Sequence, residues 1–157
     1  SIGEGRVPGR KAGSFIAGTL INVGATLALT PTLGIWYVRG GTINGGTVSA
    51  SGSPTLAPTG IGGTLKAVTN AAGRTVDATQ NIVGSASATV TGGLTLNGTL
   101  NLGNSAGSTA GQLTFSGSQT LGGNGSVVLG ASTSNSLQSK DTTFGSTAAT
   151  LTIGAGM

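Results

Sequence analysis

Residues 90–103, with the sequence VTGGLTLNGTLNLG, alternate aliphatic side chains with threonine, asparagine or glycine. Side chains two positions apart lie on the same face of a β-strand, so this spacing predicts strands with one apolar face. Gly92-Gly93 and Asn97-Gly98 interrupt the alternation, and both residue types tolerate the backbone angles of tight corners. The stretch therefore predicts short strands joined by sharp corners.

The same unit, a glycine turn followed by threonine and an aliphatic residue, recurs along the chain. Further copies stand at 40–43, 45–48 and 62–65. Their spacing is irregular, since Gly41 and Gly63 are 22 residues apart whereas Gly63 and Gly93 are 30 residues apart. Rungs of about 20 to 30 residues with loops of unequal length account for this spacing.

Outside the turns the pattern predicts short strands and no long helix. The predicted strands are 19–23, 26–29, 35–38, 42–43, 47–48, 64–68, 75–78, 88–91, 94–102, 112–116, 126–129 and 149–153. Stretches rich in serine, glycine and alanine are predicted to be loops, because the strand pattern resumes after each of them. These predicted loops are 60–63, 84–87, 103–111 and 130–135.

The composition favours a fold with a narrow hydrophobic core. Of the 157 residues, 31 are glycine, while aromatic residues make up 3% and charged residues 6%. A β-sandwich needs bulky side chains from two facing sheets, whereas a β-solenoid stacks rungs about 4.8 Å apart around a narrow interior. We therefore predict an all-β chain: a parallel β-helix (β-solenoid) with Gly/Asn/Ser-rich turns and a thin aliphatic core, forming a single domain over 1–157.

A set of apolar side chains from the best-patterned strands is predicted to share this interior: Leu94, Leu96, Leu100, Leu102, Leu113, Phe115, Val127 and Leu129. Residues 1–39 hold four of the seven cations and are expected to form a cap or a donated segment. The run at 149–157 has no charge and no proline, so it is expected to present an open strand edge. We expect the chain to be a fragment of a longer one, with that edge covered by further rungs of the same polypeptide or by a second copy joined end to end.

The charge pattern argues against nucleic-acid binding. The net charge of +4 comes from seven basic and three acidic residues, and the basic residues beyond 39 are scattered singly without aromatic neighbours. Nucleic-acid surfaces normally cluster lysine and arginine on one face. The most apolar segment, 12–29, is interrupted by glycine and asparagine, so we expect no membrane span in this chain.

The residues needed for catalysis are scarce. The chain has neither cysteine nor histidine, and its only carboxylates are Glu4, Asp77 and Asp141. Hydrolases and lyases that act on polysaccharides need paired carboxylates or a bound metal with a base, and the two aspartates are 64 residues apart. Segment 62–66 lacks the Gly-Lys-Ser/Thr order of a phosphate-binding loop. Segment 122–126 lacks the aspartate of a calcium-binding repeat and has Ser126 in its place. We predict no enzyme, and no catalytic, cofactor-binding or metal-binding residue.

Two further patterns leave alternatives open. Threonine-rich segments at 26–30 and 89–91 suggest ice binding, which would use a flat ladder of outward threonines. The irregular spacing of the turns argues against ice binding. Trp36-Tyr37 can be an exposed platform that stacks on sugars or part of a core or cap. The apolar neighbours Ile35 and Val38 favour the core.

Residues 90–103 and 111–129 resemble the repetitive passenger regions of bacterial autotransporter and filamentous-haemagglutinin-like surface proteins. The resemblance implies a right-handed parallel β-helix displayed outside a bacterial cell. It leads us to expect an extracellular or cell-surface structural or adhesive module, acting as a stalk, filament or sheath subunit. The alternative is a β-helical carbohydrate-binding or carbohydrate-active domain, with a surface polysaccharide as partner.

Overall fold

The structure is a computed structural model that describes residues 2–5, 13–52, 55–79, 84–141 and 148–157. In these residues the chain is all-β, with one short 3-10 turn, η1 (Pro31–Leu33). The strands of the first half are β1 (Ile2–Gly5), β2 (Gly13–Ile16), β3 (Thr19–Ile21), β4 (Thr26–Leu29), β5 (Ile35–Val38), β6 (Thr42–Asn44), β7 (Thr47–Ala50), β8 (Leu56–Pro58) and β9 (Thr64–Asn70). Those of the second half are β10 (Thr75–Ala78), β11 (Ala86–Leu96), β12 (Thr99–Leu102), β13 (Gly111–Ser116), β14 (Gln119–Gly122), β15 (Ser126–Leu129), β16 (Ser136–Lys140) and β17 (Leu151–Ile153).

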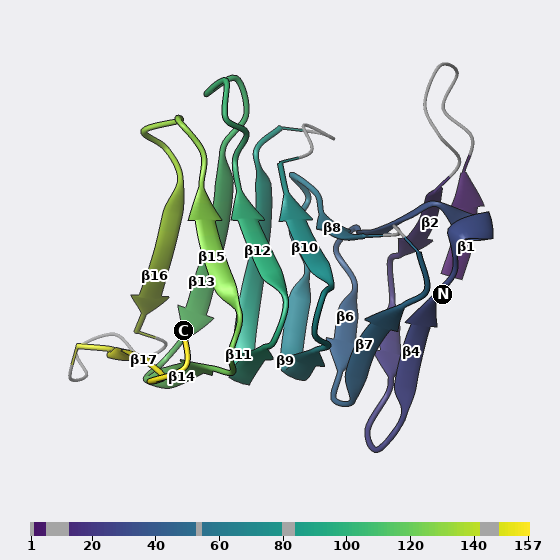
Figure 1. Ribbon diagram of the computed structural model, residues 1–157, viewed down its shortest axis with the longest axis horizontal. Helices are drawn as coiled ribbons and strands as arrows, with labels where there is room; N and C mark the ends of the chain where they lie inside the picture. Colours follow the sequence, from purple (N-terminus) through teal and green to yellow (C-terminus); the bar gives the residue numbers. More distant parts are fainter. Residues whose placement is uncertain (1, 6–12, 53–54, 80–83, 142–147) are drawn as a thin grey trace.

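The strands stack into a β-solenoid of about five turns, which confirms the predicted fold class. Apart from β1, every strand pairs in parallel with strands one turn before or after it. In Figure 1 the colours run from purple to yellow along the long axis, so each turn advances the chain in one direction. We call each turn of strands a layer; β2, β3 and β4 form the first layer and β15, β16 and β17 the last.

Each layer contributes to three faces. Face 1 is the column β2-β5-β8-β10-β12-β15. Face 2 contains β3, β6, β13 and β16 with the first halves of β9 and β11, and face 3 contains β4, β7, β14 and β17 with their second halves. Faces 2 and 3 meet where the register of β9 and β11 shifts between Thr91 and Leu94. Ala67, Gly92 and Gly93 turn this corner with φ values of 50°, 70° and 86°.

The interior is a narrow column of aliphatic side chains, as the composition predicts. Six of the eight side chains predicted to share it are confirmed as buried: Leu94, Leu96, Leu100, Leu102, Leu113 and Phe115. Val127 is half-buried and packs against the core. Burial of Leu129 was a wrong prediction: it lies in register with Leu102, but its side chain is 56% exposed. The reason is that β15 belongs to the last layer, and none of the described residues covers its far side.

Most predicted strands and loops are confirmed, with three kinds of exception. The run 94–102 is not one strand, because the chain turns at Asn97 and Gly98 between β11 and β12. A Cβ atom on Gly98 would overlap the carbonyl of Arg74, so the tight approach at this corner requires glycine. Five strands were not predicted, since their short or largely polar sequences carry no clear alternation: β1, β2, β8, β14 and β16. The loop predicted at 84–87 is shorter, because β11 begins at Ala86.

No helix among the described residues is long and apolar enough to cross a membrane.

Candidate functional site

A straight column of threonines runs along the outside of face 2. Successive members are register partners in neighbouring strands: Thr19, Thr42, Thr64, Thr89 and Thr114, followed by Gln138. They alternate along their strands with buried residues such as Leu65, Val90 and Phe115, so they point outward. Neighbouring strands lie about 4.8 Å apart, so the hydroxyl groups repeat at that spacing.

A second column runs along face 3 and consists of Thr26, Thr47, Thr69 and Thr95. At the level of sequence the irregular spacing of the turns argued against ice binding by an outward threonine ladder, but the structure places these threonines in register. Loops of unequal length absorb the irregularity between strands, whereas the paired threonines keep their register. In the sequence the threonines of face 2 recur every 22 to 25 residues, but only the strand pairing shows that they share one column.

The outward positions of face 2 also carry positive charge. Lys66 and Lys140 each lie two positions after a member of the column, Thr64 and Gln138, and both side chains are exposed. None of the outward positions in the strands of this face holds aspartate or glutamate. Face 2 is therefore lined mainly by hydroxyl, amide and lysine side chains, with the exposed Ile21 in its first strand and Asp141 directly after Lys140.

Polar side chains at the corners stabilise the fold, because they form hydrogen bonds with backbone groups. The buried Asn22 side chain donates to the carbonyl oxygens of Gly45 and Thr47, both at 3.3 Å. Asn135 accepts a hydrogen bond from the Gly111 amide at 3.0 Å and donates to the Gly130 carbonyl at 2.9 Å. These asparagines satisfy backbone groups where the chain leaves a strand, so they are structural residues.

The three carboxylates lie in or next to three different strands. Asp77 lies on face 1 in β10 and accepts a hydrogen bond from the Thr79 amide at 3.1 Å. Asp141 directly follows β16 on face 2, in the last layer, and Glu4 lies in β1. In the described part of the chain no three acidic, histidine or cysteine residues gather in a way that could hold a metal ion.

Trp36 and Tyr37 belong to the core, as their apolar neighbours predict. Both are buried, with 6% and 5% of their surfaces exposed. The Tyr37 ring stacks on Phe15 with centroids 5.3 Å apart, and the Arg39 guanidinium lies 5.9 Å from the centre of the Phe15 ring. A sugar-stacking platform at this position is therefore wrong.

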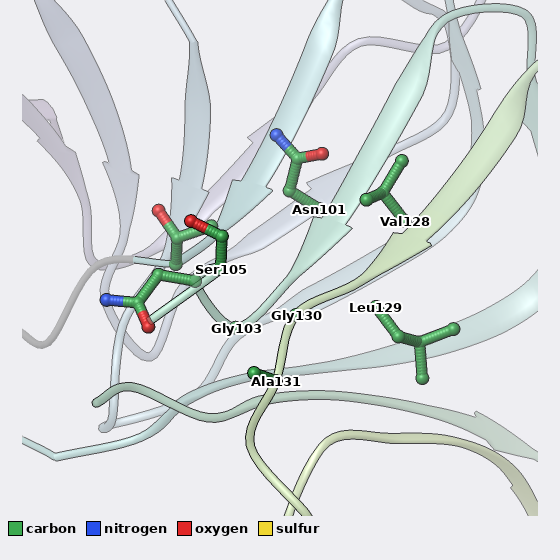
Figure 2. Close-up of a pocket in the computed structure, with 9 residues that line it drawn as sticks. Asn101, Gly103, Ser105, Val128, Leu129, Gly130 and Ala131 are labelled. Carbon is green, nitrogen blue, oxygen red and sulfur yellow. The ribbon is translucent and has the colours of Figure 1, made fainter. Parts of the chain in front are cut away.

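One hollow among the described residues lies on the outer surface near β12 and β15 (Figure 2) and has a volume of about 600 Å³. Figure 2 shows Asn101 and Val128 side by side on these two strands, with Ser105 across from them. The side-chain oxygen of Asn104, another lining residue, accepts hydrogen bonds from the Ser108 and Thr109 amides, so it holds its own loop in place. The lining contains no charged residue and no aromatic ring that would fix a ligand.

The two ends of the solenoid differ. At the last layer, β15, β16 and β17 each pair with one described strand only, and Leu129 and Ile153 are 56% and 50% exposed. At the first layer, β1 pairs antiparallel with β2, and the inward residues Ile16 and Leu29 are 1% and 2% exposed. In the described part of the chain, no strand covers the edge of β15, β16 and β17, which carries apolar side chains, as the sequence at 149–157 predicts.

These features define the class: a parallel β-solenoid with threonine columns on two outer faces. No model of a protein family, no curated protein and no solved structure matches this chain.

Proposed function

We propose that this chain is an extracellular structural and adhesive module of a bacterial surface protein, acting as a stalk or as a subunit of a filament or sheath. The observation that supports it most is the unbroken parallel stacking of strands from β2 to β15 along a single axis. Backbone hydrogen bonds between layers make such a stack a stiff rod without needing a thick core. The resemblance of residues 90–103 and 111–129 to surface-protein passenger regions supports the extracellular location.

The uncovered end fits this role. Strands β15, β16 and β17 offer free backbone groups, and Leu129 and Ile153 add apolar surface. Further rungs of the same polypeptide or a second copy of the chain would satisfy those groups. In either case the module is continued along its own axis.

A screen of the purified chain against complex polysaccharides tests the structural role. We expect no turnover of any substrate, because the carboxylates are dispersed over different faces and layers. The control is the pair of variants Asp77→Asn and Asp141→Asn, which should behave like the wild type. Turnover that either substitution abolishes would contradict the structural proposal and favour a carbohydrate-active enzyme.

A second candidate function is binding of a surface polysaccharide along face 2. The in-register threonine column and the flanking Lys66 and Lys140 favour it, since hydroxyl groups at a regular spacing match the hydroxyl groups of an extended glycan. The positive charge favours an acidic polysaccharide.

Co-sedimentation with an insoluble acidic polysaccharide tests this candidate. Replacing Thr64, Thr89 and Thr114 with valine keeps the shape and strand preference of each side chain and removes three hydroxyl groups. We expect at least tenfold weaker binding, and weaker binding at high salt. The matched control replaces Thr26, Thr47 and Thr69 on face 3. Equal binding by both triple variants would overturn the assignment to face 2.

A further inference from the structure

At the N-terminal end of the solenoid, strand β1 adds one strand to face 1. The backbone of Ile2–Gly5 pairs antiparallel with Gly13–Ile16, so on face 1 one strand lies beyond the first layer. On faces 2 and 3 the outermost of the described strands are β3 and β4, which belong to the first layer itself. Figure 1 shows β1 beside β2 at the end of the molecule where the chain starts.

This extra strand prevents a second copy from stacking head to tail on all three faces. If β15 of one copy paired with β1 of the next, β16 and β17 would stay one strand spacing, about 4.8 Å, too far from β3 and β4. If β16 and β17 paired with β3 and β4, β15 would collide with β1. A hydrogen bond cannot span an additional strand spacing.

Among the residues that the structure describes, the C-terminal end carries no such strand, so its edge can pair with the same edge of a second copy. Its three edge strands belong to one layer, and β15 and β17 contain no charged residue. A two-fold axis perpendicular to the solenoid axis would place face 1 opposite face 1 and face 2 opposite face 3, with all strand pairs antiparallel. The half-exposed Leu129 and Ile153 would then be covered by the same apolar layer of the partner.

We propose that two copies of this chain associate through their C-terminal ends about a two-fold axis, and that β1 closes the opposite ends against further growth. The inference rests on the uncovered edge in the proposed function and names the way a second copy docks there. The interface is isologous, so it gives a closed dimer. An axial filament would require β1 to be displaced.

Chemical crosslinking of single-cysteine variants tests this arrangement in the full chain, which has no cysteine of its own. Val128→Cys places an exposed thiol on β15 at the C-terminal end, and Ile21→Cys places one on β3 at the N-terminal end. With a short bismaleimide we expect Val128→Cys to form a covalent dimer and Ile21→Cys to remain a monomer on a denaturing gel. Dimers from Ile21→Cys but not from Val128→Cys would overturn the orientation.

The mass of the wild type in solution, measured by light scattering on a sizing column, separates this proposal from the one it rests on. We expect twice the monomer mass with no larger species. Long polymers of the wild type would overturn the two-fold arrangement but support the uncovered edge. A wild type that stays monomeric at high concentration would overturn both.

A double variant, Gly3→Pro with Glu4→Pro, tests the role of β1. Amides of consecutive residues point to opposite sides of a strand, so one of the two prolines must remove an amide that faces β2. We expect this variant to form assemblies larger than a dimer, at unchanged strand content by circular dichroism. A variant that remains a dimer would overturn the assignment of β1 as the element that stops growth.

Discussion

Leu96 lies fully buried in β11, beside Asn70 of the preceding layer. Its neighbour Thr95 lies in the same strand and points outward, in register with Thr69. In β11 inward and outward side chains alternate, so Leu96 contacts the aliphatic column whereas Thr95 contacts the solvent. The thin core leaves no room for a buried charge to reach water.

Replacing Leu96 with aspartate should therefore destabilise the protein severely, by about 4 kcal/mol or more, because it buries an unpaired carboxylate between layers. Urea unfolding followed by circular dichroism measures the change in the free energy of unfolding. The matched control is Thr95→Asp, which we expect to cost less than about 1 kcal/mol. Equal midpoints for the two variants would show that the inward assignment of Leu96 is wrong.

The element that sets the shape is the corner, where one strand ends and the next face begins. Two corner glycines illustrate two different needs. Gly92 has a φ of 70° and has room for a Cβ, which would lie 3.5 Å from that of Ala67. At Gly98 the backbone approaches Arg74 so closely that a Cβ would overlap its carbonyl, which also accepts the Thr99 amide at 2.8 Å.

We expect Gly92→Ala to cost about 1 to 2 kcal/mol, the strain of a left-handed backbone conformation. Gly98→Ala should cost clearly more, because the backbone of two layers must separate and the hydrogen bond from Thr99 to Arg74 weakens. Thermal melting of the two variants beside the wild type provides the comparison. A smaller loss for Gly98→Ala than for Gly92→Ala would contradict the close packing described at that corner.

On the scale of the whole molecule, the solenoid is a stack of layers whose two ends differ. Among the described residues, the N-terminal layer is covered by β1 on face 1 and buries Ile16 and Leu29, although Ile21 is exposed, whereas no strand covers β15, β16 or β17 at the C-terminal layer. Association of the chain should therefore depend on the C-terminal layer alone.

Leu151→Lys combined with Ile153→Lys should suppress self-association while leaving strand content largely intact. The two lysines place charge on an edge strand, a device that blocks pairing between edges, and β17 supports no later strand of the described chain. Light scattering and electron microscopy measure the assembly state. Unchanged association of this variant, with an intact circular dichroism spectrum, would place the contact elsewhere on the molecule.

The fold class and most of the buried residues could be predicted from the amino-acid sequence, because alternation and turn glycines are local signals. Leu94, Leu96 and Phe115 reveal their inward direction through their immediate neighbours. Three features depended on the tertiary structure: the alignment of Thr64, Thr89 and Thr114, the exposure of Leu129, and the antiparallel pairing of β1. Each depends on which strand lies next to which, and loops of unequal length hide that register from any local pattern.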